Sequence, residues 1–271
     1  MRATIRTAVI PAGGLGSRLM PLTRAVPKEL LPVWNKPVLQ YAVEEAVAAG
    51  IERIVIVTAP GKDSLQRHFA NDKLDGACRI DFVIQETARG LGDAIRVAAP
   101  RNEDIAVLLP DELLMGGNCL KGLVDCHAQR GGSVLAVQKV PLADVRRYGI
   151  VDVVTTDGYG LEVKAMVEKP LPEKAPSQLA IIGRYVLDAT VIDRLQDARP
   201  TVNNEIQLTD SIAATCGLEP VTAIHYDGER YDCGSFSGLL QANMAVAQLE
   251  EPAVVAPFLH AQRSDIHVDA A

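Results

Sequence analysis

The glycine-rich stretch after the first apolar run constrains this chain more than any other feature. Residues 5–10 form a short, mainly apolar run that predicts a strand, and the sequence Ala-Gly-Gly follows at 12–14. Glycines after a strand let the backbone approach a ligand closely and point its N–H groups at an anion. Arg18 and Lys28 add two cations at the same end of the strand. The stretch therefore predicts a loop that holds a polyphosphate.

Two other phosphate-binding motifs are excluded. A Walker loop needs a Lys-Ser or Lys-Thr pair after its glycines, and none follows here. A dinucleotide fingerprint needs a third glycine leading into a helix, whereas Leu19 stands at that position and Pro21 interrupts any helix. A nicotinamide dehydrogenase is therefore improbable. A glycine-rich turn with surface cations is the simple alternative, but Gly-Gly-x-Gly-x-Arg together with Pro-Lys-Glu at 27–29 is far more specific than a lone glycine pair.

From about Thr7 to about Gln241 the chain resembles the sugar-nucleotide pyrophosphorylases, which join a nucleoside triphosphate to a sugar 1-phosphate. The sequences Pro-Lys-Glu-Leu-Leu-Pro at 27–32 and Asn-Lys-Pro-Val-Leu-Gln-Tyr at 35–41 are most similar to the bacterial UTP–glucose-1-phosphate uridylyltransferases. The resemblance implies an α/β protein with a Rossmann-like nucleotidyltransferase fold, in which a mostly parallel mixed sheet is flanked by helices. It also implies transfer of UMP from UTP to α-D-glucose 1-phosphate, with Mg²⁺ as cofactor.

Apolar runs predict the order of the elements. The run at 38–49 predicts a helix that ends at Gly50, and the continuous run at 54–57 predicts a parallel strand covered on both faces. Further strands are expected at 79–85, 105–109, 133–138 and 179–186, and further helices at 64–70, 120–129 and 236–249. A hairpin over 149–167 turns around Asp157 and Gly158, a helix is expected within 204–213, and residues 221–234 predict a final β-turn-β element.

These elements predict one domain over residues 1–250. Its nucleotide half spans about 1–140 and its sugar-phosphate half about 141–250. Residues 251–271 form a polar C-terminal tail, which we expect to be disordered or to contact another subunit.

The nucleotide end of the site is predicted from four motifs. The resemblance assigns nucleotide binding to Ala12, Gly13, Gly14 and Asp111, and reading of the pyrimidine edge to Gln85 and Gly90. An exposed amide can pair with a uracil imide because it both donates and accepts a hydrogen bond. The alternative for Gln85 and Gly90 is a helix N-terminus with a glycine for tight packing. Arg18 and Lys28 are the expected catalytic cations for the triphosphate and the leaving group.

Two aspartates are the candidate metal ligands. Asp111 follows the strand at 105–109, and open α/β sheets bind ligands at the carboxyl ends of their strands. The resemblance implies that Asp111 and Asp232 coordinate Mg²⁺, an ion that prefers oxygen ligands. The alternative is that each aspartate caps the turn after its strand. Glu112 is either a neighbour of the metal ligands or a solvated surface residue.

The sugar-phosphate end is predicted from Gly149, Glu168 and Lys169. The resemblance implies that Glu168 accepts hydrogen bonds from sugar hydroxyls and that Lys169, a third catalytic cation, faces the phosphate. The alternative for Glu-Lys-Pro at 168–170 is an ordinary exit from a strand.

Three departures from the uridylyltransferase pattern leave alternative functions open. The region after Phe69 is short, Asp93 stands where a histidine is common, and Phe236 stands where a lysine usually follows Asp-Cys-Gly-x. The first concerns oligomer shape, and the other two concern sugar choice and turnover. The rivals are the same chemistry with dTTP or another hexose 1-phosphate, and a non-catalytic paralogue that binds a sugar nucleotide and regulates a partner enzyme.

Composition limits the remaining classes of partner. The net charge of −7 argues against nucleic acid or an anionic membrane as the main partner. No apolar run reaches the roughly 18 residues of a membrane helix, and the N-terminus lacks a signal-peptide pattern, so we expect a cytoplasmic protein. The five cysteines are scattered and lack C-x-x-C spacing, which argues against disulfides or a zinc site. A homo-oligomer, either a dimer or a tetramer, is expected.

Overall fold

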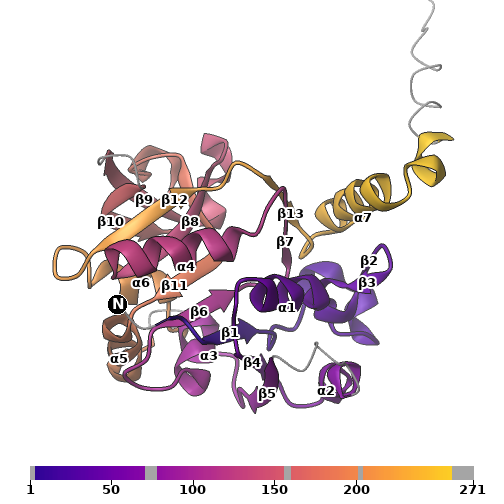
Figure 1. Cartoon of the computed structure of the whole chain (residues 1–271), viewed down its shortest axis with the longest axis horizontal. Coiled ribbons are helices and arrows are strands. Elements are labelled where there is room, and N and C mark those ends of the chain that lie inside the picture. Colours follow the sequence, from indigo (N-terminus) through magenta and orange to yellow (C-terminus); the bar gives the residue numbers. More distant parts are fainter. Residues whose placement is uncertain (1–3, 71–77, 156–159, 201–203, 258–271) are drawn as a thin grey trace, which may run out of the picture.

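The computed structural model describes residues 4–70, 78–155, 160–200 and 204–257 (Figure 1). The turn predicted around Asp157 and Gly158, residues 71–77 of the short region after Phe69, and residues 258–271 of the tail lie outside the described residues.

A nine-stranded mixed sheet forms the body of the protein (Figure 1). Four strands at one side are parallel, in the spatial order β5 (Arg79–Ile84), β4 (Arg53–Thr58), β1 (Thr7–Pro11) and β6 (Ile105–Leu108). Residues 54–58 of β4 are buried throughout, which confirms the prediction of a strand covered on both faces.

The other five strands are mainly antiparallel. They are β11 (Leu179–Leu187), β8 (Ser133–Lys139), β12 (Val221–His225), β10 (Leu161–Glu168) and β9 (Gly149–Thr155). β11 runs antiparallel to both β6 and β8 and thereby joins the two halves, while β12 is parallel to β8. β9 and β10 form the predicted hairpin. The mixed α/β sheet is confirmed, but the sheet is not mostly parallel, because every pairing except β5–β4, β4–β1, β1–β6 and β8–β12 is antiparallel.

Helices cover both faces of the sheet. One apolar cluster packs α1 (Val38–Ala48), α2 (Asp63–Phe69) and α4 (Cys119–Arg130) against one face. A second cluster packs α3 (Gly90–Ala98), α5 (Ala189–Asp197) and α6 (Leu208–Ala213) against the other. No helix among the described residues is long and apolar enough to span a bilayer.

The two strands of the final β-turn-β element are confirmed, but they belong to different sheets. β12 lies in the main sheet, whereas β13 (Glu229–Asp232) pairs antiparallel with β7 (Glu112–Met115). The backbone N–H of Cys233 donates to the carbonyl of Asp111 at 2.8 Å, which fastens the end of β13 beside the end of β6. This small sheet brings together two segments that are more than a hundred residues apart.

The helix expected within 204–213 is confirmed as α6, which begins at Leu208. The segment before α6 is bonded to the start of α3 through Ile206. The N–H of Ile206 donates to the carbonyl of Arg89, and its carbonyl accepts from the N–H of Gly92. α7 (Phe236–Glu250) projects from the body after β13 (Figure 1). The remaining elements are short: the hairpin β2 (Pro32–Val33) and β3 (Lys36–Pro37), and the 3₁₀ helices η1 (Ser17–Leu19), η2 (Leu22–Arg24), η3 (Lys28–Leu30), η4 (Leu142–Arg147) and η5 (Pro172–Lys174).

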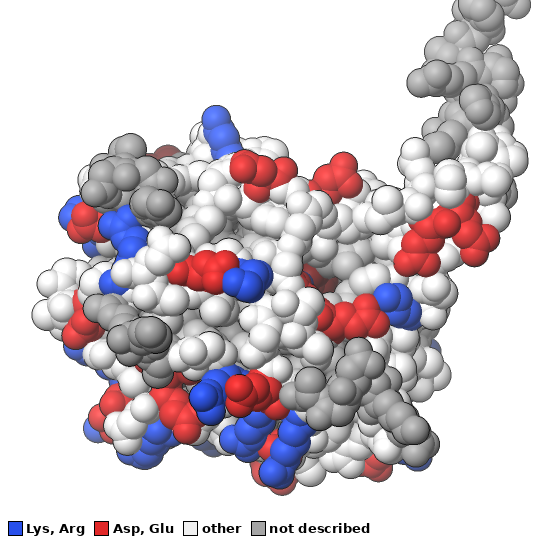
Figure 2. Space-filling model, in the orientation of Figure 1, with Lys and Arg blue, Asp and Glu red and all other residues white. Residues whose placement is uncertain are grey.

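Acidic and basic side chains are interspersed over the face of the molecule in Figure 2 rather than segregated by sign.

Candidate active site

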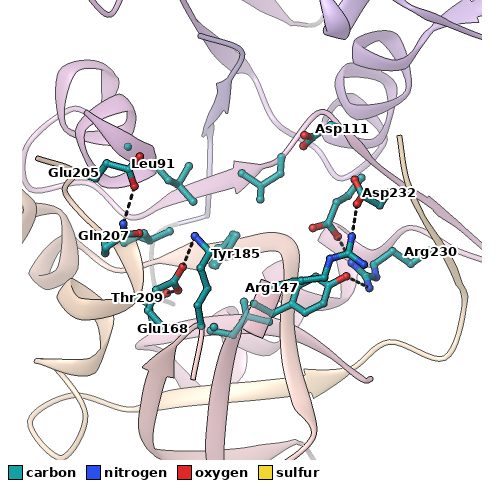
Figure 3. Close-up of a pocket in the computed structure, with 18 of the residues that line it drawn as sticks. Leu91, Asp111, Arg147, Glu168, Tyr185, Glu205, Gln207, Thr209, Arg230 and Asp232 are labelled. Atoms are coloured by element: carbon teal, nitrogen blue, oxygen red, sulfur yellow. Dashed lines mark hydrogen bonds and ion pairs between the residues drawn. The ribbon is translucent and has the colours of Figure 1, made fainter. Parts of the chain in front are cut away.

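A cavity of about 520 Å³ lies where the two halves of the chain meet (Figure 3). Its lining includes predicted residues from both halves: Arg18, Gly90, Asp111, Gly149, Glu168, Lys169 and Asp232. The structure therefore brings residues of six separate segments around one space, and those segments follow or lie within β1, α3, β6, β9, β10 and β13.

The glycine-rich loop lies beside two further predicted residues. A Cβ added to Gly13 would lie 3.2 Å from Oε1 of Gln85, and one added to Gly14 would lie 3.6 Å from Cε of Lys28. Gly16 has φ of 67°, in the left-handed region, and its Cβ would lie 2.9 Å from a methyl carbon of Thr23. The beginning of the loop is anchored to the sheet, because the N–H of Ala12 donates to the carbonyl of Val57 in β4 at 2.6 Å. Glycine is required here by both close approach and backbone conformation.

A buried lysine supports this loop from behind, and it was missed at the sequence level. Nζ of Lys62 donates to the carbonyls of Ala12 and Gly14, each at 2.7 Å, and forms an ion pair with Glu29 at 2.9 Å. The Glu29 side chain is fully buried, and burial raises the pKa of Glu29 above its ordinary value. Burial likewise lowers the pKa of Lys62. Lys62 thereby links Glu29 to the backbone of the glycine loop. Nothing in the local sequence distinguishes Lys62 from a surface lysine.

Lys28 and Asp111 form a tight pair at 2.5 Å between Nζ and Oδ2. Burial opposes the charge on each, but the two charges stabilise one another. The pKa of Lys28 is therefore raised and that of Asp111 is lowered relative to their ordinary values. Both side chains are charged at neutral pH.

Asp232 lies beside Asp111 and is surrounded by arginines. Its Oδ2 accepts from Arg147 at 2.7 Å and lies 3.5 Å from Arg18. A Cβ placed on Gly234 would be 3.0 Å from Oδ2 of Asp111 and equally 3.0 Å from Oδ1 of Asp232, so both carboxylates face one small space. Figure 3 shows the two aspartates at the same end of the cavity.

This pair fits a small divalent cation. Two carboxylates are the usual protein share of a Mg²⁺ site, and substrate phosphates and water complete it. The described residues contain no group of three or more histidine, cysteine, aspartate or glutamate side chains arranged for a metal ion. The donor set is therefore that of an ion shared with a substrate, rather than of an enclosed protein site.

The sugar-phosphate residues lie across the cavity at the ends of β9 and β10 (Figure 3). Oε2 of Glu168 accepts from the Thr209 hydroxyl at 2.6 Å, and Oε1 lies 3.1 Å from Nζ of Lys169. Lys169 has φ of 46° and a half-exposed side chain, and its N–H donates to Tyr148. A Cβ on Gly149 would lie 3.0 Å from the Thr209 hydroxyl, so the glycine makes room for these polar groups.

Three further polar residues of the cavity, Tyr148, Arg230 and Arg147, were not predicted. Arg230 donates to the Tyr148 hydroxyl at 3.0 Å, packs over the Tyr148 ring, and lies 3.3 Å from Glu112. Glu112 is therefore not solvated surface, and burial raises its pKa. Arg147, which bonds Asp232, is the third. These contacts depend on the β7–β13 pairing, which has no local sequence signal.

The amide of Gln85 differs from the prediction. It is only 7% exposed, and its Nε2 donates to Asp93 Oδ2 at 2.7 Å and to the Gly90 carbonyl at 3.4 Å. Its donor is thus taken by the protein, and the expectation of an exposed amide that both donates and accepts is wrong. Asp93 lies beside Gln85 rather than among the sugar-phosphate residues. Phe236, the other departure, begins α7 with half of its surface exposed.

Arg184 supports the loop that carries Asp111. Its guanidinium is buried and donates to the carbonyls of Leu109 and Glu112, at 3.1 and 3.0 Å, on either side of Asp111. Glu45 of α1 neutralises it at 2.8 Å. Although burial opposes its charge, Glu45 raises the pKa of Arg184.

The chain matches proteins of known activity over most of its length. The family model described as nucleotidyl transferase matches residues 7–249. A UTP–glucose-1-phosphate uridylyltransferase of Staphylococcus epidermidis is 40% identical over 92% of this chain and 94% of that protein. One of Bacillus subtilis is 38% identical over 91% of each chain.

Solved structures agree in fold. A UDP-glucose pyrophosphorylase complexed with UDP-glucose superimposes with a TM-score of 0.85 at 36% identity, covering 91% of this chain and all of that one. A UTP-bound enzyme of the same description from Acinetobacter baumannii gives 0.83 at 33% identity, covering 96% and 99%.

Proposed function

This chain belongs to the nucleotidyl transferase family, and we propose that it transfers UMP from UTP to α-D-glucose 1-phosphate, giving UDP-glucose and pyrophosphate. The observation that carries the proposal is the convergence of Arg18, Asp111, Asp232 and the Glu168–Lys169 pair on one cavity. Lys28 joins this cavity to the glycine loop, because it lies beside Gly14 and pairs with Asp111. Relatives at 40% and 38% identity are named for this reaction.

The reaction needs no protein nucleophile. The phosphate of a sugar 1-phosphate is largely dianionic at neutral pH, since its second pKa is about 6. One of its oxygens attacks the α-phosphorus of UTP, and the new P–O bond forms as the bond to pyrophosphate breaks. Catalysis then consists of holding two anions in line and stabilising the charge of the transferring group.

The residues form two groups, one for each substrate. Arg18 and Lys28, next to the glycine loop, hold the triphosphate and stabilise the departing pyrophosphate. Lys169 holds the attacking phosphate, while Glu168 accepts hydrogen bonds from sugar hydroxyls. Support for this division comes from the neighbours of each cation. Lys28 lies beside Gly14 and pairs with Asp111, Arg18 lies 3.5 Å from Asp232, and Lys169 pairs with Glu168. Figure 3 shows the two aspartates across the cavity from Glu168.

Nucleotidyltransferases generally use a divalent metal ion, and we propose Mg²⁺ for this one. Asp111 and Asp232 would hold it, and the ion would supply positive charge between phosphate groups. Lys28 pairs with Asp111 at 2.5 Å, and Arg147 pairs with Asp232 at 2.7 Å. The charge of Lys28 also lowers the pKa of Asp111, which keeps that carboxylate ionised.

Three broader predictions accompany the reaction. Residues 1–250 are proposed to form one domain, since strands of both halves share one sheet. Self-association is proposed because Leu240 and Leu249 of α7 are 64% and 72% exposed, and light scattering on the purified protein tests it. A cytoplasmic location stays a prediction of the sequence.

Pyrophosphate release over a grid of nucleoside triphosphates and sugar 1-phosphates tests the proposal. We expect the fastest release with UTP and glucose 1-phosphate, and little with ATP or GTP. Equal rates with GTP would contradict the base assignment. Release with dTTP or another hexose 1-phosphate alone would favour the rival substrates. Binding of UDP-glucose without release from any pair would favour a non-catalytic regulator.

A further inference from the structure

The environment of Gln85 restricts how its amide can face a nucleotide base. The side chain lies at the end of β5, and its Nε2 has two acceptors: Asp93 Oδ2 at 2.7 Å and the Gly90 carbonyl at 3.4 Å. An amide nitrogen carries two hydrogens, so both are engaged. Oε1 points toward the glycine loop, 3.2 Å from the position of a Cβ on Gly13.

The orientation of the amide follows from the chemistry of Asp93. A carboxylate only accepts hydrogen bonds, so the group 2.7 Å from it must be the nitrogen of Gln85 and not the oxygen. Asp93 is itself 4% exposed and lies in the first turn of α3, and its other oxygen pairs with Arg96 one turn later. Rotating the amide by half a turn would bring two oxygens together in a buried site.

We propose that Asp93 is a positioning residue that locks the Gln85 amide with its oxygen toward the base, and thereby selects bases that carry a hydrogen at N3. This inference rests on the proposed function, because it takes Gln85 to face the base of the bound nucleoside triphosphate. Uracil has an N–H at position 3, which a fixed oxygen accepts. Cytosine has a lone pair there, which the same oxygen repels. Asp93 therefore sets selectivity for UTP over CTP without touching either nucleotide.

The test compares UTP with CTP in the full-length protein and its variants, by kcat/KM for pyrophosphate release and by Kd from calorimetry. The main variant is Asp93→Asn, which has the same size but can donate to Oε1 as well as accept from Nε2. It allows both orientations of the Gln85 amide. We expect the selectivity for UTP over CTP to fall by at least about tenfold, partly through tighter binding of CTP. Asp93→Thr, whose hydroxyl can also donate, gives the same result if D93N does not fold.

Two controls separate positioning from a general structural effect. Asp81→Asn removes a carboxylate that lies between Arg53 and Arg79 on β5, and it should leave the selectivity unchanged. In a Gln85→Met background there is no amide to orient, so adding D93N should not change the UTP-to-CTP ratio further. A change of ratio that is equal with and without Gln85 would overturn the inference.

The outcomes distinguish this inference from the proposed function. If the unmutated protein prefers UTP strongly and D93N keeps that preference, the role of Asp93 is overturned while the reaction stands. If the unmutated protein neither binds nor turns over UTP, the proposed function fails and the inference fails with it. A selectivity that falls in D93N and not in D81N supports both.

Discussion

Replacing Lys62 with methionine should destabilise the protein and remove two hydrogen bonds to its glycine loop. Lys62 is 12% exposed at its side chain, and it is the cation paired with the fully buried Glu29. Lys62→Met keeps the length of the apolar stem but leaves the Glu29 carboxylate buried without its ion pair. Breaking one partner of a buried pair costs about 3–5 kcal/mol, so we expect a loss of free energy of unfolding in that range.

The pH dependence of this loss identifies its cause. Burial already raises the pKa of Glu29 in the folded state, and removing Lys62 raises it further. A carboxyl group whose folded pKa exceeds its unfolded pKa binds more protons in the folded state between the two values, so stability falls as pH rises through that window. The difference between K62M and the unmutated protein should therefore be smaller at pH 5.5 than at pH 7.5.

Urea unfolding followed by circular dichroism measures both effects. Lys36→Met is the matched control, because Lys36 pairs with Glu44 at 2.8 Å with both side chains about one-third exposed or more. An exposed pair contributes about 0–1 kcal/mol, so K36M should be nearly neutral. The double variant E29Q/K62M should be more stable than K62M alone. A K62M protein as stable as K36M, or equally destabilised at both pH values, would refute the reasoning.

Three further predictions concern the site. Asp111→Asn and Asp232→Asn should each lower the turnover number by about 10²-fold or more with little change in melting temperature, as measured by pyrophosphate release and circular dichroism; near-normal rates for both would place the ion elsewhere. Lys169→Ala should raise KM for glucose 1-phosphate and lower kcat, and unchanged values of both would leave Lys169 in an ordinary strand exit. Arg184→Lys should lower the free energy of unfolding by about 2–4 kcal/mol and raise the Mg²⁺ concentration needed for half-maximal rate, because it loosens the backbone on both sides of Asp111; urea unfolding and a metal titration measure these, and an unchanged Mg²⁺ requirement would contradict the positioning role.

Local patterns were enough to predict the strands of the main sheet and the glycine loop. Continuous apolar runs such as 54–57 can be buried on both faces only in a covered sheet, and the position of Asp111 follows from the end of such a run. The pairing of Asp111 with Asp232 was inferred only from the resemblance. In the structure it depends on β7 and β13, which are each four residues long and joined across the fold.

The buried charges could not be predicted, because burial is a property of the folded chain. Lys62 and Asp93 have the sequence neighbourhoods of surface residues, and the apolar run around Arg184 does not reveal the partner of its charge, yet each is largely enclosed and bonds a segment of the site. The same limit explains the error over Gln85: its position at the end of a strand was visible in the sequence, but the carboxylate that takes its donor lies eight residues away, on α3.

The proposed reaction is tested most directly by identifying its products. The purified protein is incubated with UTP, glucose 1-phosphate and Mg²⁺, and phosphorus NMR follows the phosphate resonances with time. We predict that UDP-glucose and pyrophosphate appear in equal amounts, and that a chelator stops their formation. UTP that stays intact in the presence of glucose 1-phosphate and Mg²⁺, or that is consumed without forming UDP-glucose, would contradict the account.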